Sequence, residues 1–358
     1  MTSKPVIVFA LPDLTAGGAE MVLIRLMNAL PREKYSPVLM AVRNDGVLKD
    51  FIAPGIPLHT LGAINVIAAL PKLYKKLSEL NPDVVVSTMA HMNFSVLLLR
   101  PFFKKTKFIV RESTVPDCTL EARGALGPVI RALYPVLYRF ADKIIAPARI
   151  ILDKMHSQLK VPSKTMAVLP NPVDTSMITI SAPPTTNDGA IRFIAAGRLH
   201  PEKGFDRLIK ALKDYRGPAW HLTILGEGEQ REQLEHMIRA LKFEDKISLP
   251  GFRREPWQEF SAADCFLLPS RWEGLPNAAL ESLACGTKII AMRDAGGIVE
   301  IAAEAPGDAV TLTHTMQDFL KAMEKITPAQ EKKSLLPARY EKKAVIENFE
   351  KLLQEMLA

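Results

Sequence analysis

The sequence predicts an α/β protein with two successive domains, each a doubly wound parallel sheet covered by helices. Short apolar runs with the length of buried strands alternate with helical patterns along most of the chain. The alternation breaks off in Asn171–Thr175 and Ser181–Gly189, where Pro, Ser, Thr, Asn and Gly are abundant. It then starts again with a second, similar series. We therefore expect one domain over residues 1–170 and another over residues 171–338.

Apolar runs predict the strands, and apolar residues that recur at helical spacing predict the helices. The strands expected in the first domain are Val6–Leu11, Tyr35–Val42, Val84–Ser87, Phe108–Val110, Lys143–Ala146 and Met166–Leu169, with helices at Ala19–Leu30 and Ile67–Leu80. In the second domain the expected strands are Ile191–Ala196, His221–Leu225, Lys246–Leu249, Cys265–Leu268 and Lys288–Met292, with helices at Phe205–Leu212, Glu229–Leu241 and Asn277–Ala284. A last helical pattern, Lys342–Leu357, follows Pro337, and we expect residues 339–358 to cross back to the first domain.

The composition is that of an ordinary globular protein. The chain has 358 residues, of which 48% are hydrophobic. Polar residues interrupt the longest apolar stretch, Val84–Leu99, before it reaches the length of about eighteen residues that a membrane-spanning helix needs. The start of the chain lacks the features of a signal peptide, and Cys118, Cys265 and Cys285 have no metal-ligand spacing. We therefore expect a cytoplasmic protein with reduced thiols.

The positive charge is concentrated in the first half of the chain. Residues 1–170 contain 22 Lys and Arg against 12 Asp and Glu, whereas residues 171–358 contain 24 against 27. The basic clusters, which also contain aromatic and aliphatic residues, are Arg100–Lys107, Pro71–Lys76 and Arg123–Lys143. This mixture suits an anionic membrane surface, although a solvated basic face over an ordinary core stripe gives the same pattern. No nucleic-acid recognition motif accompanies the charge, so nucleic acid is not an expected partner.

The segment 271–286 carries the strongest functional signal. A buried-strand run precedes it, and Pro276-Asn277 predicts the start of a helix. Glu273 is thus expected in the loop between strand and helix, and Glu281 just over one turn into the helix. The free N–H groups of a helix start attract anions, while carboxylates accept hydrogen bonds from the hydroxyl pairs of polyols. A phosphate joined to sugars fits both demands.

Two further strand-to-helix loops have features of anion sites. The first carries Arg198, which can fork onto phosphate oxygens, and Lys203, which can act as a point charge beside it. Two solvated loop cations would give the same pattern. The second loop carries Gly17 and Gly18, and adjacent glycines let the backbone approach a ligand closely. Its spacing differs from G-x-G-x-x-G, so no dinucleotide site is expected.

Together these segments resemble the retaining glycosyltransferases of the GT-B fold, in particular the large bacterial family known as family 4 or glycosyl transferases group 1. The resemblance extends over essentially the whole chain. The matching segments are Gly17–Glu20, Asn171–Asp174, Ala196–Gly204, Leu225–Gly228, Pro250–Phe252 and Glu273–Glu281. The second-domain set is specific, and the Gly-Gly pair is supportive. The resemblance implies two Rossmann-like domains facing a cleft that holds a nucleotide-sugar donor.

The resemblance also implies roles for individual residues. The donor-binding residues that it implies are Gly17, Gly18, Arg198, Lys203, Gly251, Phe252, Arg253, Glu273, Gly274, Leu275, Pro276, Asn277 and Glu281. Arg198 and Lys203 would lie with the 274–277 loop near the donor diphosphate, and the 251–253 turn would border the base. Glu281 would hold the ribose, and Glu273 the donor sugar. Because two cations and a helix N-terminus can neutralise a leaving diphosphate, no metal ion or other cofactor is required.

One position departs from the family pattern. Many members carry a His near the transferred sugar, in the first-domain loop after the strand equivalent to Phe108–Val110, whereas this chain has Arg-Glu-Ser-Thr at 111–114. Glu112, Ser113 or His91 can take its place. The expected catalytic residues are Glu273, Arg198, Lys203, Glu112 and His91.

The function that the resemblance implies is transfer of a hexose or N-acetylhexosamine from a UDP-sugar, with retention of configuration, to a lipid-linked saccharide of a bacterial surface glycan such as lipopolysaccharide. Uracil is chosen from its frequency in the family alone. The basic first domain would hold the enzyme on the inner face of the cytoplasmic membrane. Two alternatives stay open. One is an enzyme similar to UDP-N-acetylglucosamine 2-epimerases, which needs no acceptor, and the other is a sugar-nucleotide-binding protein without turnover, suggested by the missing His.

Overall fold

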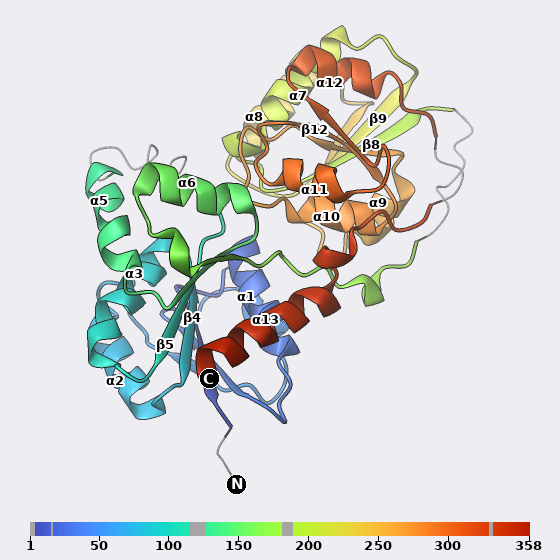
Figure 1. Cartoon of the computed structure of the whole chain (residues 1–358). Helices are drawn as coiled ribbons and strands as arrows, with labels where there is room; N and C mark the ends of the chain where they lie inside the picture. Colours follow the sequence, from blue (N-terminus) through green and yellow to red (C-terminus); the bar gives the residue numbers. More distant parts are fainter. Residues whose placement is uncertain (1–3, 16, 115–126, 181–188, 329–331) are drawn as a thin grey trace. The chain divides into compact units, whose positions relative to one another are not determined.

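The computed structural model describes residues 4–15, 17–114, 127–180, 189–328 and 332–358. It divides into two compact units: unit 1 comprises Met1–Pro172 with Lys342–Ala358, and unit 2 comprises Val173–Glu341 (Figure 1). The sequence places these divisions two and three residues earlier, after residues 170 and 338. The Val173 N–H donates to the Tyr340 carbonyl at 2.9 Å, so the two crossings between the units are bonded to each other at the edge of unit 2.

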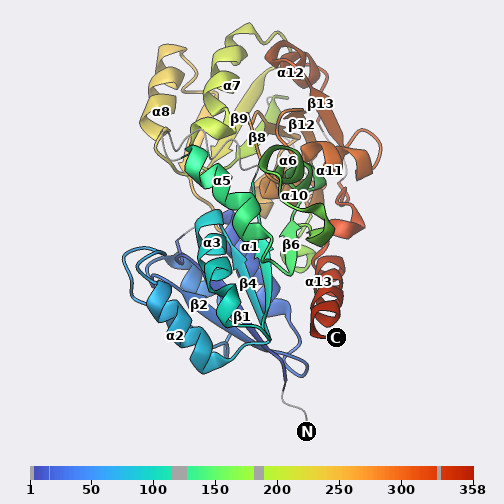
Figure 2. The same ribbon diagram turned by 60° about the vertical axis from the view of Figure 1, so that its left-hand side comes forward.

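In the part of the chain that the structure describes, unit 1 contains a parallel sheet of seven strands in the order β3-β2-β1-β4-β5-β6-β7. Figure 2 shows β2, β1 and β4 side by side in this sheet. These strands are β1 Val6–Leu11, β2 Ser36–Ala41, β3 Leu58–Thr60, β4 Val84–Thr88, β5 Lys107–Arg111, β6 Lys143–Ala146 and β7 Met166–Val168. The helices are α1 Gly18–Ala29, α2 Leu70–Leu80, α3 Ala90–Leu99, α5 Gly127–Tyr138, α6 Arg149–Leu159 and α13 Lys342–Leu357. Short 3-10 helices lie at η1 Val47–Phe51, η2 Arg100–Phe102 and η4 Ser163–Thr165.

Unit 2, within its described residues, contains a parallel sheet of six strands in the order β10-β9-β8-β11-β12-β13. These strands are β8 Ile191–Ala196, β9 Trp220–Leu225, β10 Ile247–Gly251, β11 Cys265–Leu268, β12 Lys288–Met292 and β13 Val310–Thr313. The helices are α7 Phe205–Ala211, α8 Arg231–Ala240, α9 Trp257–Ala262, α10 Asn277–Ala284, α11 Ile298–Glu304 and α12 Met316–Met323. Its 3-10 helices are η5 Thr175–Met177, η6 Pro201–Lys203, η7 Leu212–Asp214 and η8 Ala338–Tyr340.

Each sheet has one place where the strand order reverses. The first strand of each unit, β1 or β8, lies beside the fourth, β4 or β11, and the later strands are added outward from this pair. The connections after the two strands lead to opposite faces of the sheet, which leaves the crevice where ligands bind in sheets of this topology. The fold class predicted from the sequence, two doubly wound parallel sheets, is confirmed.

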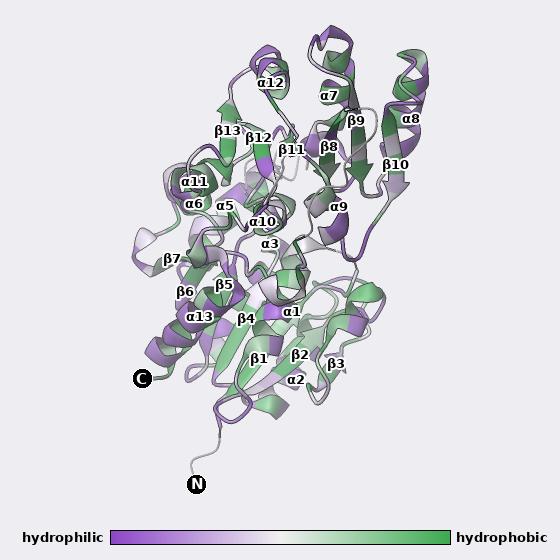
Figure 3. Cartoon of the chain, turned by 90° about the vertical axis from the view of Figure 1, so that its right-hand side faces the viewer, coloured by the Kyte–Doolittle hydropathy of each residue, from purple (hydrophilic) through white to green (hydrophobic). Residues whose placement is uncertain are grey.

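The central strands are mainly apolar because helices cover both faces of each sheet. All residues of β4 and β11 are buried. In Figure 3 the strands are mainly in the green of hydrophobic residues, whereas outer helices such as α13 also carry purple, hydrophilic residues. α13 buries Val345, Phe349 and Leu352 at helical spacing, and the Phe349 ring lies 6.2 Å from the ring of Phe9 in β1. The C-terminal helix is therefore part of the core of unit 1.

Two strands and several helices were not predicted from the sequence. β3 has three residues, none of them buried, and β13 is only partly buried, so neither gives a clear apolar run. α3 has apolar residues on all sides and follows β4 so closely that the apolar stretch shows no helical period. Among the described helices, none has the length and apolar composition that crossing a membrane requires. Cys265 and Cys285 are buried free thiols, and Cys118 lies outside the described residues.

Candidate functional site

The strongest candidates of unit 2 meet at the switch between β8 and β11. Lys203 ends η6, which follows β8, and Glu273 lies in the loop between β11 and α10. The Lys203 Nζ donates to both oxygens of the Glu273 carboxylate, at 2.7 and 2.8 Å. The Ser270 hydroxyl donates to the same carboxylate at 2.8 Å. The structure therefore brings two of the expected catalytic residues into direct contact.

This ion pair is shielded from water but not closed to a ligand. The side chains of Lys203 and Glu273 are 19% and 10% exposed, so salt screens their attraction less than that of a surface pair. The carboxylate accepts three hydrogen bonds and offers about four lone-pair sites, and the ammonium uses two of its three N–H donors. The carboxylate can therefore accept one more hydrogen bond, from a hydroxyl, and the ammonium can donate one more, to a phosphate oxygen. Removing either partner would leave the other charge largely buried and unpaired.

Side chains that the sequence did not single out brace the loops around the pair. Arg271 donates to both oxygens of Asp206 at 2.7 and 2.8 Å, and this pairing lowers the pKa of Asp206 and raises that of Arg271. Arg207 donates to the carbonyl oxygens of Pro269 and Ser270, at 2.7 and 2.6 Å. These partners are 62 to 65 residues apart in the chain. Local sequence patterns cannot reveal contacts at such separations.

Two glycines permit the close packing of the same loops. A Cβ at Gly204, where φ is +67°, would lie 2.1 Å from the Pro269 carbonyl oxygen. A Cβ at Gly296, where φ is +60°, would lie 2.2 Å from the Glu273 carbonyl oxygen. No other residue fits either position without moving the loop that carries Glu273. Gly296 was missed in the sequence, although the Gly296-Gly297 pair before α11 was an available signal.

α10 begins where the sequence predicted it. Pro276 is its N-cap with an extended backbone, and no side chain caps its first turn, as in helix starts that bind anions. Leu275 is 6% exposed and anchors the preceding loop in the core. Asn277 and Glu281 are both partly exposed and lie one turn apart, so they share a face of the helix. Their roles toward a ribose and a phosphate stay predictions.

Three further candidates of unit 2, Arg198, Phe252 and Arg253, are on its surface. Arg198 is exposed in the loop after β8; its carbonyl accepts a hydrogen bond from the His200 N–H at 2.8 Å, whereas its side chain has no hydrogen bond or ion pair with any described residue. Phe252, just after β10, has 64% of its surface exposed. Arg253 beside it pairs with Glu259 at 3.3 Å. The structure bonds neither Arg198 nor Phe252 to the Lys203–Glu273 pair.

In unit 1 the Gly-Gly turn lies between β1 and α1, at the switch of that sheet. Gly17 is the N-cap of α1, and a Cβ there would lie 2.1 Å from the carboxylate of Glu20. The Glu20 side chain, 6% exposed, is thus folded back over the helix start, where the helix dipole favours a negative charge. A side chain at position 17 would therefore displace the Glu20 carboxylate from its place over the helix start.

Glu112 and His91 follow the adjacent strands β5 and β4. Glu112 is 4% exposed, and its carboxylate accepts hydrogen bonds from the Tyr138 hydroxyl and, at 3.0 Å, from the Asn93 amide. Burial raises the pKa of Glu112 to about 7. His91 is in the first turn of α3 and is partly exposed, as is Ser113 beside Glu112. The structure therefore places Glu112 in a buried polar network that joins β5, α3 and α5.

Arg111, the last residue of β5, is a buried cation that the sequence reasoning did not single out. It is 1% exposed and donates from Nη2 to the Asn171 side-chain oxygen, while its Nε and Nη1 have no partner in the described structure. Burial lowers its pKa to about 10, so it stays charged at neutral pH. The available signal was a charged residue at the end of an apolar strand run.

Two doubly wound units, with an ion pair and a helix start at the switch of the second, define the GT-B class of glycosyltransferase. Two family models match consecutive parts of the chain: Glycosyltransferase Family 4 matches residues 16–177, and Glycosyl transferases group 1 matches residues 177–344. Together the two models cover residues 16–344. The chain therefore belongs to the glycosyltransferases that these two models describe, and it is a glycosyltransferase.

Several of its relatives are bacterial glycosyltransferases of lipid-linked or lipopolysaccharide glycan synthesis. The N-acetylgalactosamine-N,N'-diacetylbacillosaminyl-diphospho-undecaprenol 4-alpha-N-acetylgalactosaminyltransferase of Campylobacter jejuni is 28% identical over 81% of each chain. The lipopolysaccharide 1,6-galactosyltransferase of Escherichia coli is also 28% identical, over 80% of this chain and 78% of its own. Among solved structures, Anabaena HepE in complex with UDP-glucose has a TM-score of 0.79 at 18% identity, covering 98% of this chain and 99% of its own. At that identity the likeness concerns the fold.

The raised pKa of Glu112 predicts that the stability of unit 1 falls as the pH rises. The folded chain binds the Glu112 proton more tightly than the unfolded chain, so this contribution is complete below the unfolded pKa of 4.5 and lost as the pH passes about 7. Glu112→Gln removes the ionisation. The free energy of unfolding of wild type should therefore fall relative to that of the variant as the pH rises. The difference between the two should change by about 2–3 kcal/mol from about pH 5 to pH 8.

Urea denaturation followed by circular dichroism at several pH values measures this difference. Glu33→Gln removes an exposed carboxylate from the same unit and should keep the wild-type profile. A pH profile of Glu112→Gln parallel to that of wild type would show that the pKa of Glu112 is not raised in the folded protein.

Proposed function

We propose that this enzyme transfers a hexose or N-acetylhexosamine from a UDP-sugar to a lipid-linked saccharide, with retention of anomeric configuration, in the synthesis of a bacterial surface glycan. The observation that carries the proposal is the Lys203–Glu273 pair at the switch between β8 and β11. Sheets of this topology bind ligands at that place. The pair combines a cation for phosphate with a carboxylate for sugar hydroxyls. The name of the Campylobacter relative includes an undecaprenol-linked substrate, which supports the proposed acceptor. The Anabaena structure contains UDP-glucose, which supports the proposed donor.

The chemistry needs stabilisation of negative charge on the departing diphosphate. As the bond between the anomeric carbon and the diphosphate oxygen breaks, Arg198, Lys203 and the start of α10 take up that charge. The acceptor oxygen forms its bond to the same face of the sugar, and its proton passes to the diphosphate. Glu281 holds the ribose and Glu273 the transferred sugar. The protein cations thus act in place of a metal ion, and we propose no metal cofactor.

The hydrogen bonds of the ion pair fit these assignments. Two Lys203 N–H groups and the Ser270 hydroxyl fix the Glu273 carboxylate before a donor arrives. The third N–H group of Lys203 suits a phosphate oxygen, so the donor need not break the pair. A carboxylate held in this way acts on the sugar without having to reorient during the reaction.

α5 carries the surface that we assign to the membrane. Val129, Leu133 and Val136 are 58%, 38% and 47% exposed and recur at the spacing of one helix face. Arg131 and Arg139 are exposed on the same helix and in the turn after it. Aliphatic side chains beside cations suit an anionic bilayer, here the inner face of the cytoplasmic membrane. The basic cluster predicted from the sequence begins at position 123, outside the described residues.

The activity is tested with purified protein, a panel of nucleotide sugars and an undecaprenyl-diphosphate-linked saccharide. UDP release should depend on the acceptor, and magnetic resonance of the product should show the anomeric configuration of the donor. Conversion of the donor without acceptor would favour the epimerase-like alternative. Tight UDP binding with no turnover across the panel would favour a sugar-nucleotide-binding protein, and selective use of a GDP- or ADP-sugar would overturn the assignment of the base.

Replacing the two glutamates of the segment 273–281 is expected to change different properties, UDP affinity in one case and the turnover number in the other. Glu281→Ala should weaken UDP binding by about 10-fold or more, because it loses a charge-assisted hydrogen bond. Glu273→Ala should leave UDP affinity within about threefold and lower the turnover number by about 10²-fold, the scale for losing one preorganised group. Calorimetry with UDP and initial rates separate the two. Glu232→Ala, an exposed acid of α8, is the control, and equal weakening of UDP binding by both variants would contradict the division of roles.

Membrane binding should depend on the exposed apolar face of α5. The variant Val129→Ser/Leu133→Ser/Val136→Ser should bind vesicles that contain phosphatidylglycerol at least about tenfold more weakly, since burying one such side chain contributes roughly 1.5–3 kcal/mol. Vesicle co-sedimentation measures it. The control Ile64→Ser/Ile67→Ser changes side chains that are 82% and 77% exposed but lie outside α5. Equal losses in the two variants would show that α5 is not the contacting surface.

A further inference from the structure

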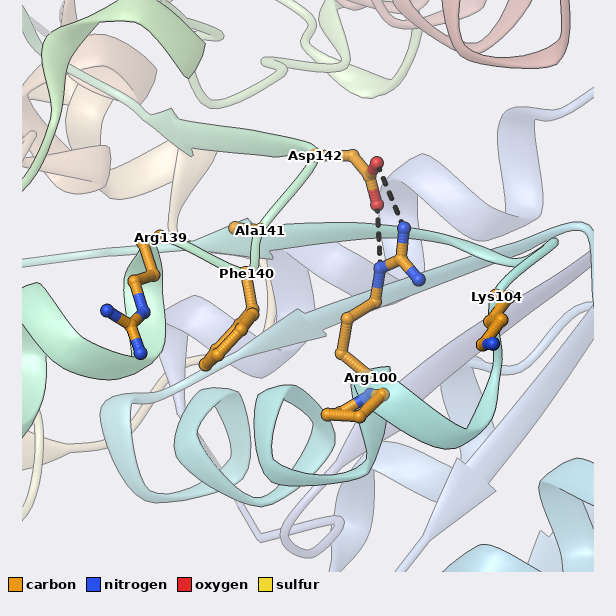
Figure 4. A pocket seen from close by; sticks show the side chains of 7 residues that line it. Arg100, Lys104, Arg139, Phe140, Ala141 and Asp142 are labelled. Atoms are coloured by element: carbon orange, nitrogen blue, oxygen red, sulfur yellow. Dashed lines mark hydrogen bonds and ion pairs between the residues drawn. The ribbon is translucent and has the colours of Figure 1, made fainter.

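A cavity of about 470 Å³ opens in unit 1 between the end of α3 and the turn that follows α5. Its lining includes Arg100, Lys104, Arg139, Phe140 and Asp142 (Figure 4). Asp142 directly precedes β6, and its carboxylate accepts a hydrogen bond at 2.8 Å from the N–H of Phe108, near the start of β5. The cavity is thus at the amino ends of the strands, whereas Gly17 and Glu112 lie at their carboxyl ends. It is separate from the candidate site.

The cavity has more positive charge than its own carboxylate balances. Arg100 is held by Asp142, with nitrogen–oxygen distances of 3.3 and 3.4 Å, and by the Phe103 carbonyl at 3.0 Å. Lys104 and Arg139 stand on either side of Arg100, and neither has an acidic partner among the described residues (Figure 4). The cavity therefore presents two uncompensated cations to a ligand.

The side-chain types of these cations suit a phosphate diester. The Arg139 guanidinium, a planar fork of N–H donors, lies 4.9 Å from the centre of the Phe140 ring, within the range of a cation–π contact. A fork of this kind binds phosphate oxygens with two hydrogen bonds, and a flexible ammonium such as that of Lys104 adds a point charge. The volume lies within the range of about 300–1,000 Å³ typical of small-ligand sites and exceeds the needs of a single inorganic anion.

Exposed apolar side chains flank the cavity on both sides. Phe102, which follows the lining residue Pro101, is 68% exposed, and its ring meets the exposed Tyr74 of α2 at 5.7 Å. Val136 is 47% exposed and lies one helical turn before Arg139. These apolar side chains would contribute nothing to the binding of a soluble anion. An anionic lipid can use both features, because its phosphate binds the cations and its acyl chains contact the apolar side chains.

We propose that this cavity binds the phosphate headgroup of an anionic glycerophospholipid. The inference rests on the membrane association proposed above and adds to it a defined headgroup site. The glycerol phosphate enters between Lys104 and Arg139, while the acyl chains stay in the bilayer against the apolar faces of α5 and η2. Because the lipid is held at the end of α5, it fixes the orientation of unit 1 on the surface without taking part in glycosyl transfer.

The experiment compares binding of the full-length protein to phosphatidylcholine vesicles that are made equally anionic with either phosphatidylglycerol or oleate, which carries no phosphate. Lys104→Gln/Arg139→Gln leaves the Arg100–Asp142 pair intact. On phosphatidylglycerol vesicles it should bind more than about 25-fold more weakly than wild type, because charge attraction alone contributes a factor of about five for each basic side chain near an anionic bilayer and the bonds to the headgroup phosphate add to it. On oleate vesicles the loss should be several-fold smaller.

A second pair of charge removals serves as the control. Lys49→Gln/Lys164→Gln lowers the formal net charge of +7 by the same two units, at exposed positions of unit 1 outside the cavity. Equal losses by the two double variants on phosphatidylglycerol, or equal losses of the cavity variant on both vesicles, would overturn the headgroup site. Unchanged thermal melting and UDP affinity of the variants exclude misfolding. The assay needs neither donor nor acceptor, so its outcome is independent of the proposed transferase activity.

Discussion

The Lys203–Glu273 ion pair is the interaction on which the site in unit 2 depends. It joins the loops after β8 and β11, two strands that are neighbours in the sheet but are separated by two further strands in the chain. The Arg271–Asp206 pair and the contacts of Arg207 with backbone carbonyls hold the same loops at their outer side. Since the cation and the carboxylate are oriented during folding, a ligand meets them already in place.

The sequence predicted most of the fold because its strands are buried on both faces. β1 and β11 form continuous apolar runs, β8 is interrupted only by Arg192 and β4 ends in Ser87 and Thr88, and the bounds of all four agree with the predicted ones within about a residue. The same reasoning failed for strands that are only partly buried and for a helix that has apolar residues on all sides. β3 and β13 lie at sheet edges and expose residues, whereas α3 carries apolar residues on all sides and so lacks the period that marks a helix.

The site was only partly predictable, for a related reason. The residue types of the loops after β8 and β11 indicated a phosphate and a sugar, but the bond between Lys203 and Glu273 joins positions 70 residues apart. The environment of Glu112 also depends on the tertiary structure. The sequence offered it as a catalytic group in a loop, while the structure places it under α5, bonded to Tyr138. Whether a carboxylate faces a ligand or the core is decided by packing between elements, which a single chain pattern does not contain.

Packing also decides which of the excess positive charges in the first half of the chain can contact a membrane. Many of these cations are already occupied: Arg43 pairs with Asp13, Lys34 with Glu350 and Arg100 with Asp142. Arg111 is buried beneath the surface altogether. Lys104 and Arg139 differ because they are exposed, close to apolar side chains and without acidic partners in the described structure. A net charge summed over a sequence attracts a membrane at long range, but we assign the contact itself to the unpaired cations that lie beside exposed apolar side chains.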